Sequence, residues 1–187
     1  KLCKSKSIMM LMNDRLKVTL QTIHTPLRKI TKEITKDNII EKVCIINDEL
    51  KAKFGYAKPK ILICGVNPHA GEEGLLGNEE IDIIIPAVKS LNKMGITVDG
   101  PVPADTAFIK KFVSKYDVIH TMYHDQGLPV IKYDNFSRTT NVTLGLPIIR
   151  VSVDHGTATE LVGTGKVDIS SFTQALKVAR DISKSAI

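Results

Sequence analysis

The chain has 187 residues, of which 43% are hydrophobic and 25% are charged, an ordinary composition for a globular protein. The formal net charge is +6, but the basic residues form no arginine-rich or aromatic-interleaved run, so no nucleic-acid partner is expected. No apolar stretch is long enough to cross a membrane, so a membrane partner is not expected either.

The cysteines and the first residues indicate the compartment. Cys3, Cys44 and Cys64 lie far apart, which predicts reduced thiols in a cytoplasmic protein and neither a disulfide framework nor a thiolate metal site. The opening 1–15 is basic and then briefly apolar, but its apolar part is too short for a signal peptide and lacks a small-residue cleavage site. Because the chain begins with Lys1, further residues are expected upstream.

The first third of the chain predicts a strand followed by helices. The alternating, β-branched run 16–23 is typical of a strand that ends at His24, and Pro26 favours a short helix after it. Asn38 is predicted to cap a long helix that continues to about residue 54, where Gly55 ends it.

The rest of the chain continues the alternation. The run 60–66, KILICGV, is almost continuously apolar, as in a parallel strand buried on both faces. Asn78 is predicted to cap a helix that continues to Met94. Further strands are expected at 118–122, 142–144 and 148–153, and further helices at about 105–114, 156–162 and 171–184. This pattern predicts an α/β/α fold with a largely parallel sheet, whose sites form beyond the carboxyl ends of the strands.

Three histidines mark such positions. His24, His69 and His124 stand in the contexts IHTPL, NPHAG and YHDQG, each where an apolar run meets a helix start or a Gly/Pro turn. Imidazoles that converge at strand ends usually hold a borderline divalent cation, zinc first, with magnesium, manganese or cobalt as alternatives. His120 lies inside a predicted strand and is interpreted as a satisfied polar group of the core.

The loop between Asn67 and Glu80 is rich in glycine. Gly71, Gly74 and Gly77 let the backbone approach a ligand closely, and the helix after Asn78 would direct free N–H groups at an anion. The glycines match neither a Walker loop nor a GxGxxG fingerprint. The alternative, a glycine-rich turn with a solvated histidine, stays open.

Four charged residues could carry chemistry, and each also has a structural interpretation. Asp125 could orient a metal-bound imidazole, move a proton or cap a helix, and Lys132 could bind a carboxylate or phosphate. Arg150 stands beside two apolar runs and would be costly to bury without an anionic partner, which a salt bridge would satisfy as well as a substrate. Asp105 is either a helix cap or a catalytic carboxylate.

Taken together, several motifs resemble one family. The segments IHTPL, CGVNPHAGEEG, GNEEID, GPVPADT, MYHDQGLPVIKY and NVTLGLPIIRVSVDHGTA are similar to those of the 4-hydroxythreonine-4-phosphate dehydrogenases of pyridoxal phosphate biosynthesis. The resemblance extends from about Leu16 to Ala179. It implies an isocitrate/isopropylmalate-dehydrogenase-like fold with two α/β/α domains, a cleft between them and a homodimer.

The resemblance also implies roles for single residues. The metal ligands of the family match His24, His69 and His124, contributed by both subunits of the dimer. Acidic positions close to the substrate match Asp105 and Asp125, and the general base stays open between these two and a metal-bound water. The substrate-binding residues of the family match Lys132, Asn141 and Arg150, and His155 belongs to a motif on the cofactor side.

The implied reaction is oxidation of the C3 hydroxyl of 4-phosphooxy-L-threonine by NAD(P)⁺. The β-keto acid then loses carbon dioxide to give 3-amino-2-oxopropyl phosphate, a precursor of pyridoxal 5′-phosphate (vitamin B6). Whether NAD or NADP is used stays open.

Family members are longer at the N-terminus, so the chain is expected to lack most of the N-terminal domain. Residues 1–140 are then the metal-binding, dimerising domain, and residues 141–187 would complete the absent one. Three alternatives remain open: a paralogous dehydrogenase of 4-phosphorylated threonate or erythronate, a non-catalytic metal-binding dimerisation fragment, and a fragment whose histidines are vestigial.

Overall fold

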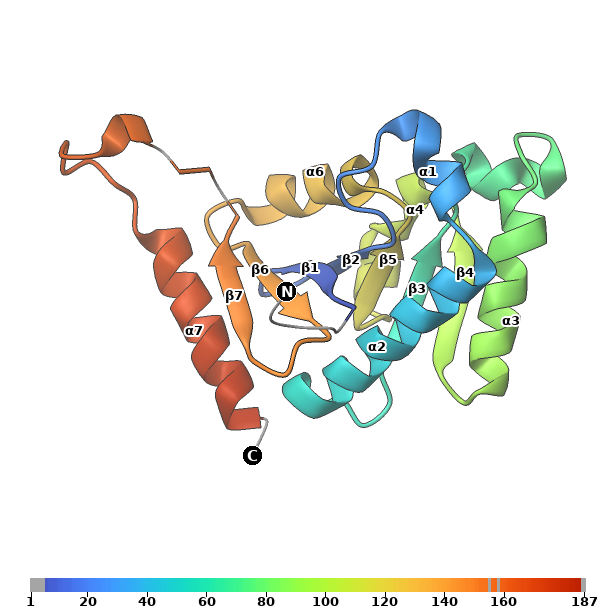
Figure 1. Cartoon of the computed structure of the whole chain (residues 1–187), viewed down its shortest axis with the longest axis horizontal. Helices are drawn as coiled ribbons and strands as arrows, with labels where there is room; N and C mark the ends of the chain where they lie inside the picture. Colours follow the sequence, from blue (N-terminus) through green and yellow to red (C-terminus); the bar gives the residue numbers. More distant parts are fainter. Residues whose placement is uncertain (1–5, 155, 158, 186–187) are drawn as a thin grey trace.

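In the computed structural model, which describes residues 6–154, 156–157 and 159–185, a seven-stranded sheet runs through the centre of the protein (Figure 1). The strand order is β4-β3-β5-β2-β1-β6-β7. The strands are β1 (Ile8–Met12), β2 (Lys17–Leu20), β3 (Lys60–Cys64), β4 (Thr97–Val102), β5 (Val118–Thr121), β6 (Thr140–Leu144) and β7 (Arg150–Val153).

The sheet is largely parallel, as predicted. Strands β4, β3, β5 and β2 pair in parallel, and β6 runs in the same direction because it is antiparallel to β1, which is itself antiparallel to β2. Only β1 and β7 among the described strands run the opposite way. The carboxyl ends of β2, β5 and β3, three neighbouring strands, therefore meet at one edge.

Helices cover both faces and make the predicted α/β/α sandwich. The helices are α1 (Leu27–Glu33), α2 (Lys36–Phe54), α3 (Ile85–Lys93), α4 (Ala104–Ala107), α5 (Lys110–Val113), α6 (His124–Asn135) and α7 (Ser170–Ser185). One core cluster joins the sheet to α1, α2, α3 and α7, and a second joins the opposite face to α4, α5 and α6. Figure 1 shows α7 alongside β7 at one edge of the sheet and α3 alongside β4 at the other.

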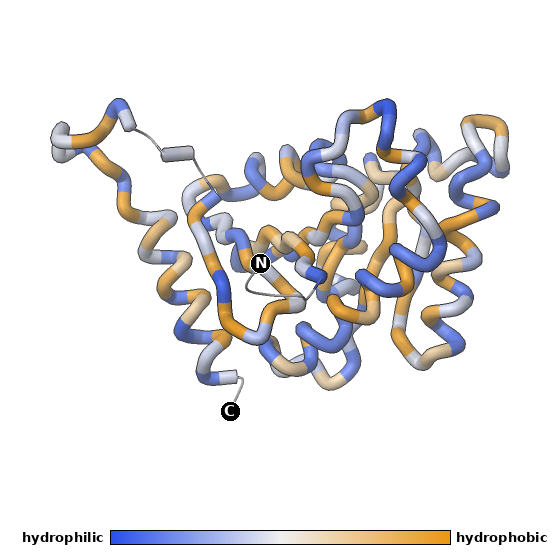
Figure 2. The backbone as a smooth tube through the Cα atoms, viewed as in Figure 1, coloured by the Kyte–Doolittle hydropathy of each residue, from blue (hydrophilic) through white to orange (hydrophobic). Residues whose placement is uncertain are grey.

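The β3 sequence shows why a continuous apolar run makes a central strand. Successive side chains point to opposite faces, so Ile61 and Ile63 enter the first core cluster while Leu62 and Cys64 enter the second. All four are fully buried. Figure 2 shows the hydrophobic stretches that result along the central strands.

The long helix begins earlier than predicted. Its N-cap is Thr35, whose hydroxyl accepts the N–H of Asn38 at 3.2 Å, so the prediction of Asn38 as the cap was wrong. Thr35 has an extended backbone (φ −127°, ψ 155°) and lies three residues upstream, which adds a turn to the helix. Gly55 ends the helix with φ 71°, as expected.

Two further cap predictions were wrong. The segment 80–84 forms a π-helical turn, η2, before α3, and no side chain caps it, so Asn78 is not the N-cap. The predicted helix at 105–114 is split into α4 and α5, because the backbone of Ile109 is extended. Pro103 stands at the N-cap of α4 and Asp105 lies in its first turn, so Asp105 does not cap the helix.

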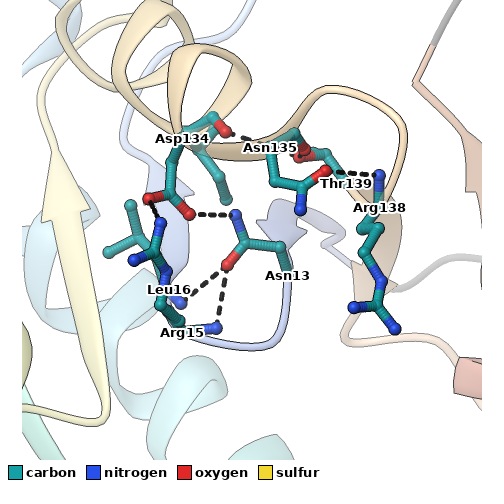
Figure 3. A network of polar contacts seen from close by, with 8 residues as sticks. Asn13, Arg15, Leu16, Asp134, Asn135, Arg138 and Thr139 are labelled. Carbon is teal, nitrogen blue, oxygen red and sulfur yellow. Dashed lines mark hydrogen bonds and ion pairs between the residues drawn. The ribbon is translucent and has the colours of Figure 1, made fainter.

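Strands β1 and β4 were not predicted, and β1 forms a hairpin with β2. Asn13 shapes the hairpin turn, because its Oδ1 accepts the N–H groups of Arg15 and Leu16, both at 2.9 Å. Its amide also donates to Asp134 of α6 at 2.9 Å, and Arg15 forms an ion pair with the same carboxylate (Figure 3). This network fastens the far end of α6 to the hairpin.

The C-terminal part has less regular structure than predicted. Of the helix expected at 156–162, the described residues show only a short 3₁₀ turn, η3, at Thr159–Leu161, and Ala158 lies outside the described residues. The helix expected at 171–184 is α7, with one more residue at each end. In the described residues, no helix is long and apolar enough to span a membrane.

Candidate metal and substrate site

The three histidines follow the three neighbouring parallel strands. His24 lies in the turn after β2, His69 in the turn after β3, and His124 is the first residue of α6, three residues after the end of β5. Each is therefore at the carboxyl edge of the sheet, as the sequence predicted. Within one chain, however, the structure brings only two of them together.

His24 and His124 form the pair. Their ring centroids are 5.8 Å apart and their planes are tilted by 41°. They line one pocket together with Ile23, Thr25, Tyr123 and Asp125 from the same two strand ends and with residues of α1.

Asp125 sets the orientation of the His124 ring. Its Oδ1 accepts a hydrogen bond from Nδ1 of His124 at 2.6 Å, which leaves Nε2 as the nitrogen that is free for a ligand. Tyr123 stands at the N-cap of α6 and no side chain caps the helix, so the capping role considered for Asp125 was wrong. The contact is the kind that carboxylates make to metal-binding imidazoles.

His69 sits on an unusual turn. The short 3₁₀ element η1, Pro68–Gly74, has positive φ at four residues other than glycine: His69, Ala70, Glu72 and Glu73. Left-handed backbone costs roughly 1–2 kcal/mol for each such residue, so the surrounding structure has to impose it.

A buried carboxylate lies beneath this turn, that of Glu80, which is 2% exposed. Its Oε1 accepts the backbone N–H groups of Val66 and Asn67 at 2.7 and 2.8 Å, and its Oε2 accepts the side-chain amide of Asn67 at 2.9 Å. Gly71 lets the turn close over it, because a Cβ there would lie 2.6 Å from Oε2. The glycine-rich loop is thus wrapped around a buried side chain of its own.

The two imidazoles of His24 and His124 are ligands of the kind that a borderline divalent cation prefers. Two imidazoles share a pocket, and one of them is oriented by a carboxylate. Among the residues that the structure describes, no three His, Cys, Asp or Glu side chains lie close enough to hold one metal ion. Any further ligand, His69 included, would have to come from outside this pocket.

The residues expected to bind substrate lie outside the histidine pocket, on α6, β6 and β7. Lys132 is eight residues after His124 on α6, or about 12 Å along the helix, and pairs with Asp154 at 3.4 Å. Asn141 is on β6, and its Oδ1 is buried without a hydrogen-bond partner among the described residues. Arg150 is exposed on β7 and donates to Thr143 Oγ1 at 2.7 Å, so the expected burial cost does not arise. None of these three is among the described residues that line the histidine pocket.

Of the two other candidates, the structure describes only Asp105. Asp105 is exposed in the first turn of α4, a helix that contacts the η1 turn of His69 and not the histidine pocket. His155, considered for the cofactor side, lies outside the described residues.

His120 is a core group, as interpreted from the sequence. It is fully buried and contacts Thr19 Oγ1 at 2.9 Å and Gln21 Oε1 at 3.0 Å. The Gln21 oxygen can only accept, so Nε2 carries the proton and Nδ1 accepts from Thr19. Burial, followed by the charge of Lys42, lowers the pKa of His120 to about 3.

The sequence patterns did not predict three buried polar residues beneath the site, namely Gln21, Glu80 and Gln126. Each binds backbone groups or core side chains and none is exposed to a ligand. The one available signal was position, since all three lie within a few residues of a strand end or of the glycine-rich loop.

Comparison with known proteins decides the family. The protein-family model described as "Pyridoxal phosphate biosynthetic protein PdxA" matches residues 1–179. The chain belongs to the PdxA family. This confirms the resemblance drawn from the motifs.

Curated relatives of the PdxA family carry the expected enzyme name. The 4-hydroxythreonine-4-phosphate dehydrogenase of Pseudoalteromonas atlantica is 52% identical over 178 residues, which are 95% of this chain and 55% of that protein. The enzyme of the same name from Pseudoalteromonas translucida is 52% identical over 172 residues. The chain spans about half the length of the curated relatives it matches.

Solved structures support the fold. The crystal structure of 4-hydroxythreonine-4-phosphate dehydrogenase from Klebsiella pneumoniae matches with a TM-score of 0.86 and 40% identity, covering 95% of this chain and 54% of that one. A terephthalate 1,2-cis-dihydrodiol dehydrogenase from Burkholderia xenovorans matches with a TM-score of 0.73 and 28% identity, covering 92% and 55%. The PdxA scaffold is thus shared by a dehydrogenase named for a different substrate.

Proposed function

We propose that this chain supplies the metal-binding, dimer-forming part of a dehydrogenase that oxidises 4-phosphooxy-L-threonine with NAD(P)⁺ and releases carbon dioxide. The observation that carries the proposal is the His24–His124 pair at the carboxyl edge of the sheet, in a chain of the PdxA family. The product, 3-amino-2-oxopropyl phosphate, would enter pyridoxal 5′-phosphate synthesis in the cytoplasm.

The residues of the pocket have distinct tasks in this proposal. His24 and His124 would hold a divalent cation, zinc by preference for imidazole nitrogen, and Asp125 occupies Nδ1 of His124, which leaves Nε2 as the nitrogen that would bind the ion. When bound, such an ion acts as a Lewis acid on the substrate hydroxyl and on the carbonyl that replaces it. Asp125 is 77% exposed at its side chain and is therefore also placed to exchange a proton with solvent.

The other residues bind the anionic substrate. Lys132 and Arg150 supply positive charge for the phosphate and carboxylate groups. The buried Oδ1 of Asn141, which has no hydrogen-bond partner among the described residues, supports a role in binding, because a ligand donor would satisfy an acceptor that otherwise carries a desolvation cost.

A homodimer accounts for the position of His69. His24 and His124 supply two imidazole ligands, and a third is needed to complete a site of three imidazoles. Among the described residues of one chain, His69 does not lie close enough to His24 and His124 to bind the same ion. In the proposed dimer, the site is shared and the partner completes it.

The first experiment measures NADH or NADPH formation by the chain with 4-phosphooxy-L-threonine, with and without a chelator. Chelator-sensitive reduction of the nicotinamide supports the proposal in full. Absence of reduction by the folded chain would contradict a complete active site in this chain and leave the metal-binding fragment as the alternative. A panel with 4-phosphorylated threonate and erythronate tests the paralogue.

The second experiment titrates zinc into variants of the chain. His24→Ala and His124→Ala are expected to weaken zinc binding at least tenfold, and Lys29→Ala, an exposed change on α1, serves as the control. If the site is shared, His69→Ala weakens zinc binding as well and reduces zinc-dependent dimer formation, measured by analytical ultracentrifugation. Unchanged affinity in His69→Ala would contradict the shared site.

A further inference from the structure

The segments that carry the three histidines are joined by one buried set of hydrogen bonds, centred on the peptide groups of Met122. The carbonyl of Met122 accepts two hydrogen bonds from Thr22, one from the backbone N–H at 3.2 Å and one from the side-chain hydroxyl at 2.8 Å. Met122 is fully buried and Thr22 is 5% exposed. Thr22 precedes His24 by two residues and Met122 precedes His124 by two, so these bonds join the exits of β2 and β5 just beneath the pair.

The side chain of Gln126 closes the set from the other side. Its Oε1 accepts the N–H of Met122 at 2.7 Å, and its Nε2 donates to the carbonyl of Gly65 at 2.7 Å. Gly65 directly follows β3 and begins the segment that leads to His69. One amide therefore bridges the exits of β5 and β3 from the first turn of the helix that bears His124.

The close packing of α6 makes this bridge possible. The next residue, Gly127, lies so near the sheet that a Cβ would be 2.6 Å from Val18 Cγ1 and 2.9 Å from Thr121 Oγ1. The absence of a side chain at Gly127 lets the first turn of α6 lie close against β2 and β5. From there the Gln126 amide reaches the exits of β5 and β3.

We propose that Gln126 is a positioning residue of the metal site: by binding Met122 N–H and Gly65 C=O, it fixes where His124 stands relative to His24 and where the His69 turn begins. As a statement about a metal site, this rests on the proposed function. Gln126 touches no ligand, and its effect passes through the backbone. Residues that orient ligands in this indirect way typically change metal affinity 10–100-fold when they are lost.

The test compares Gln126→Met with Asn92→Leu. Methionine keeps the length of the side chain and loses both hydrogen bonds. Asn92 is a matched control, because its side-chain amide also bridges two elements. It joins α3 to the edge strand β4 through Val88 O, Val98 O and Val98 N, away from the histidine pocket. Thr22→Val is a second, shape-conserving variant that removes the hydroxyl bond to Met122.

Two readouts are used, one with metal and one without. In the metal-free chain, the nuclear Overhauser cross-peak between the ring protons of His24 and His124 is expected to weaken or vanish in Gln126→Met and Thr22→Val, and to persist in Asn92→Leu. The zinc dissociation constant is expected to rise at least tenfold in Gln126→Met and to stay within twofold of native in Asn92→Leu.

The outcomes separate this inference from the proposed function. A folded Gln126→Met that keeps both the cross-peak and the native zinc affinity overturns the positioning role. If Gln126→Met does not fold, Gln126→Glu, which loses the donor to Gly65 C=O and keeps an acceptor for Met122 N–H, replaces it, and an unchanged cross-peak with unchanged zinc affinity there overturns the role. If the native chain binds no zinc, the proposed metal site fails, while the cross-peak still decides whether Gln126 positions the two rings.

Discussion

His120 lies wholly inside the protein and is neutral there, because burial and the nearby positive charge of Lys42 lower its pKa to about 3. On unfolding, the imidazole returns to water, where its pKa is about 6.5. Below pH 6.5 the unfolded chain therefore takes up a proton that the folded chain does not, so stability is lost as the pH falls from about 6.5 toward 3. Between pH 7 and pH 5 this group alone lowers the free energy of unfolding by about 2 kcal/mol.

A His120→Gln variant is expected to lack this loss of about 2 kcal/mol between pH 7 and pH 5. Urea denaturation at the two pH values measures it. Thr19→Val is the matched control, because it removes one hydrogen bond to the same ring and leaves the imidazole in place. An equal pH dependence in native protein and His120→Gln would contradict the assignment of a neutral, buried imidazole.

Glu80 and its neighbour Glu79 offer a second comparison between single residues. Glu80→Ala leaves the N–H groups of Val66 and Asn67 without their buried acceptor, and we expect a loss of about 3 kcal/mol of stability. Glu79→Ala removes only one bond to the side-chain amide of Asn67 and should cost less than about 1 kcal/mol. Thermal unfolding of the two variants provides the test. Similar costs in both would show that Glu80 does not hold the His69 turn.

At the scale of elements, hydrophobic patterns predicted the central strands well and the turns poorly. The run at β3 was predictable because a strand buried on both faces has to be apolar throughout. Strand β1 was missed because its short apolar run follows lysines, and β4, with the sequence TVDGPV, has little apolar pattern. The left-handed turn at His69 follows two residues, Val66 and Asn67, that Glu80 binds across 14 and 13 residues of sequence, contacts that no local pattern encodes.

The position of α6 depends on the absence of a side chain at Gly127. Gly127→Ala would place a methyl group against Val18 and push the helix outward, with an expected cost of about 1–3 kcal/mol. Val18→Ala opens space at the same point. We therefore expect the double variant to be more stable, by about 1 kcal/mol, than the sum of the two single effects predicts. Chemical denaturation of all four proteins measures this coupling, and strict additivity would contradict the close contact.

For the whole molecule, the sequence predicted the α/β/α sandwich and the edge at which the histidines stand, but not which of them meet. His24 and His124 follow neighbouring strands and meet within one chain. His69 follows the next strand, but its turn keeps it out of the shared pocket. A site shared between subunits would depend on how two copies assemble, which hydrophobic periodicity does not encode.

The segment 141–187, expected to complete another domain, carries apolar side chains on its outer surface. On α7, Val178 and Ile182 are buried against the sheet, whereas Phe172 and Leu176 are 58% and 56% exposed. Several other side chains nearby in sequence are exposed as well, namely Ile148, Val162, Val167 and Ile169. Exposed apolar patches of this kind bind hydrophobic dyes and promote association.

We therefore expect the native chain to enhance the fluorescence of the dye ANS, and the double variant Phe172→Ser/Leu176→Ser to reduce that enhancement. The double variant should change the free energy of unfolding by less than about 1 kcal/mol, because exposed side chains contribute little to the stability of the folded state. Val178→Ser is the matched control on the buried face of the same helix. It should destabilise the protein by about 2 kcal/mol or more, because a buried apolar side chain is replaced by a hydroxyl. Strong destabilisation by the double variant would show that this face of α7 is packed within the chain.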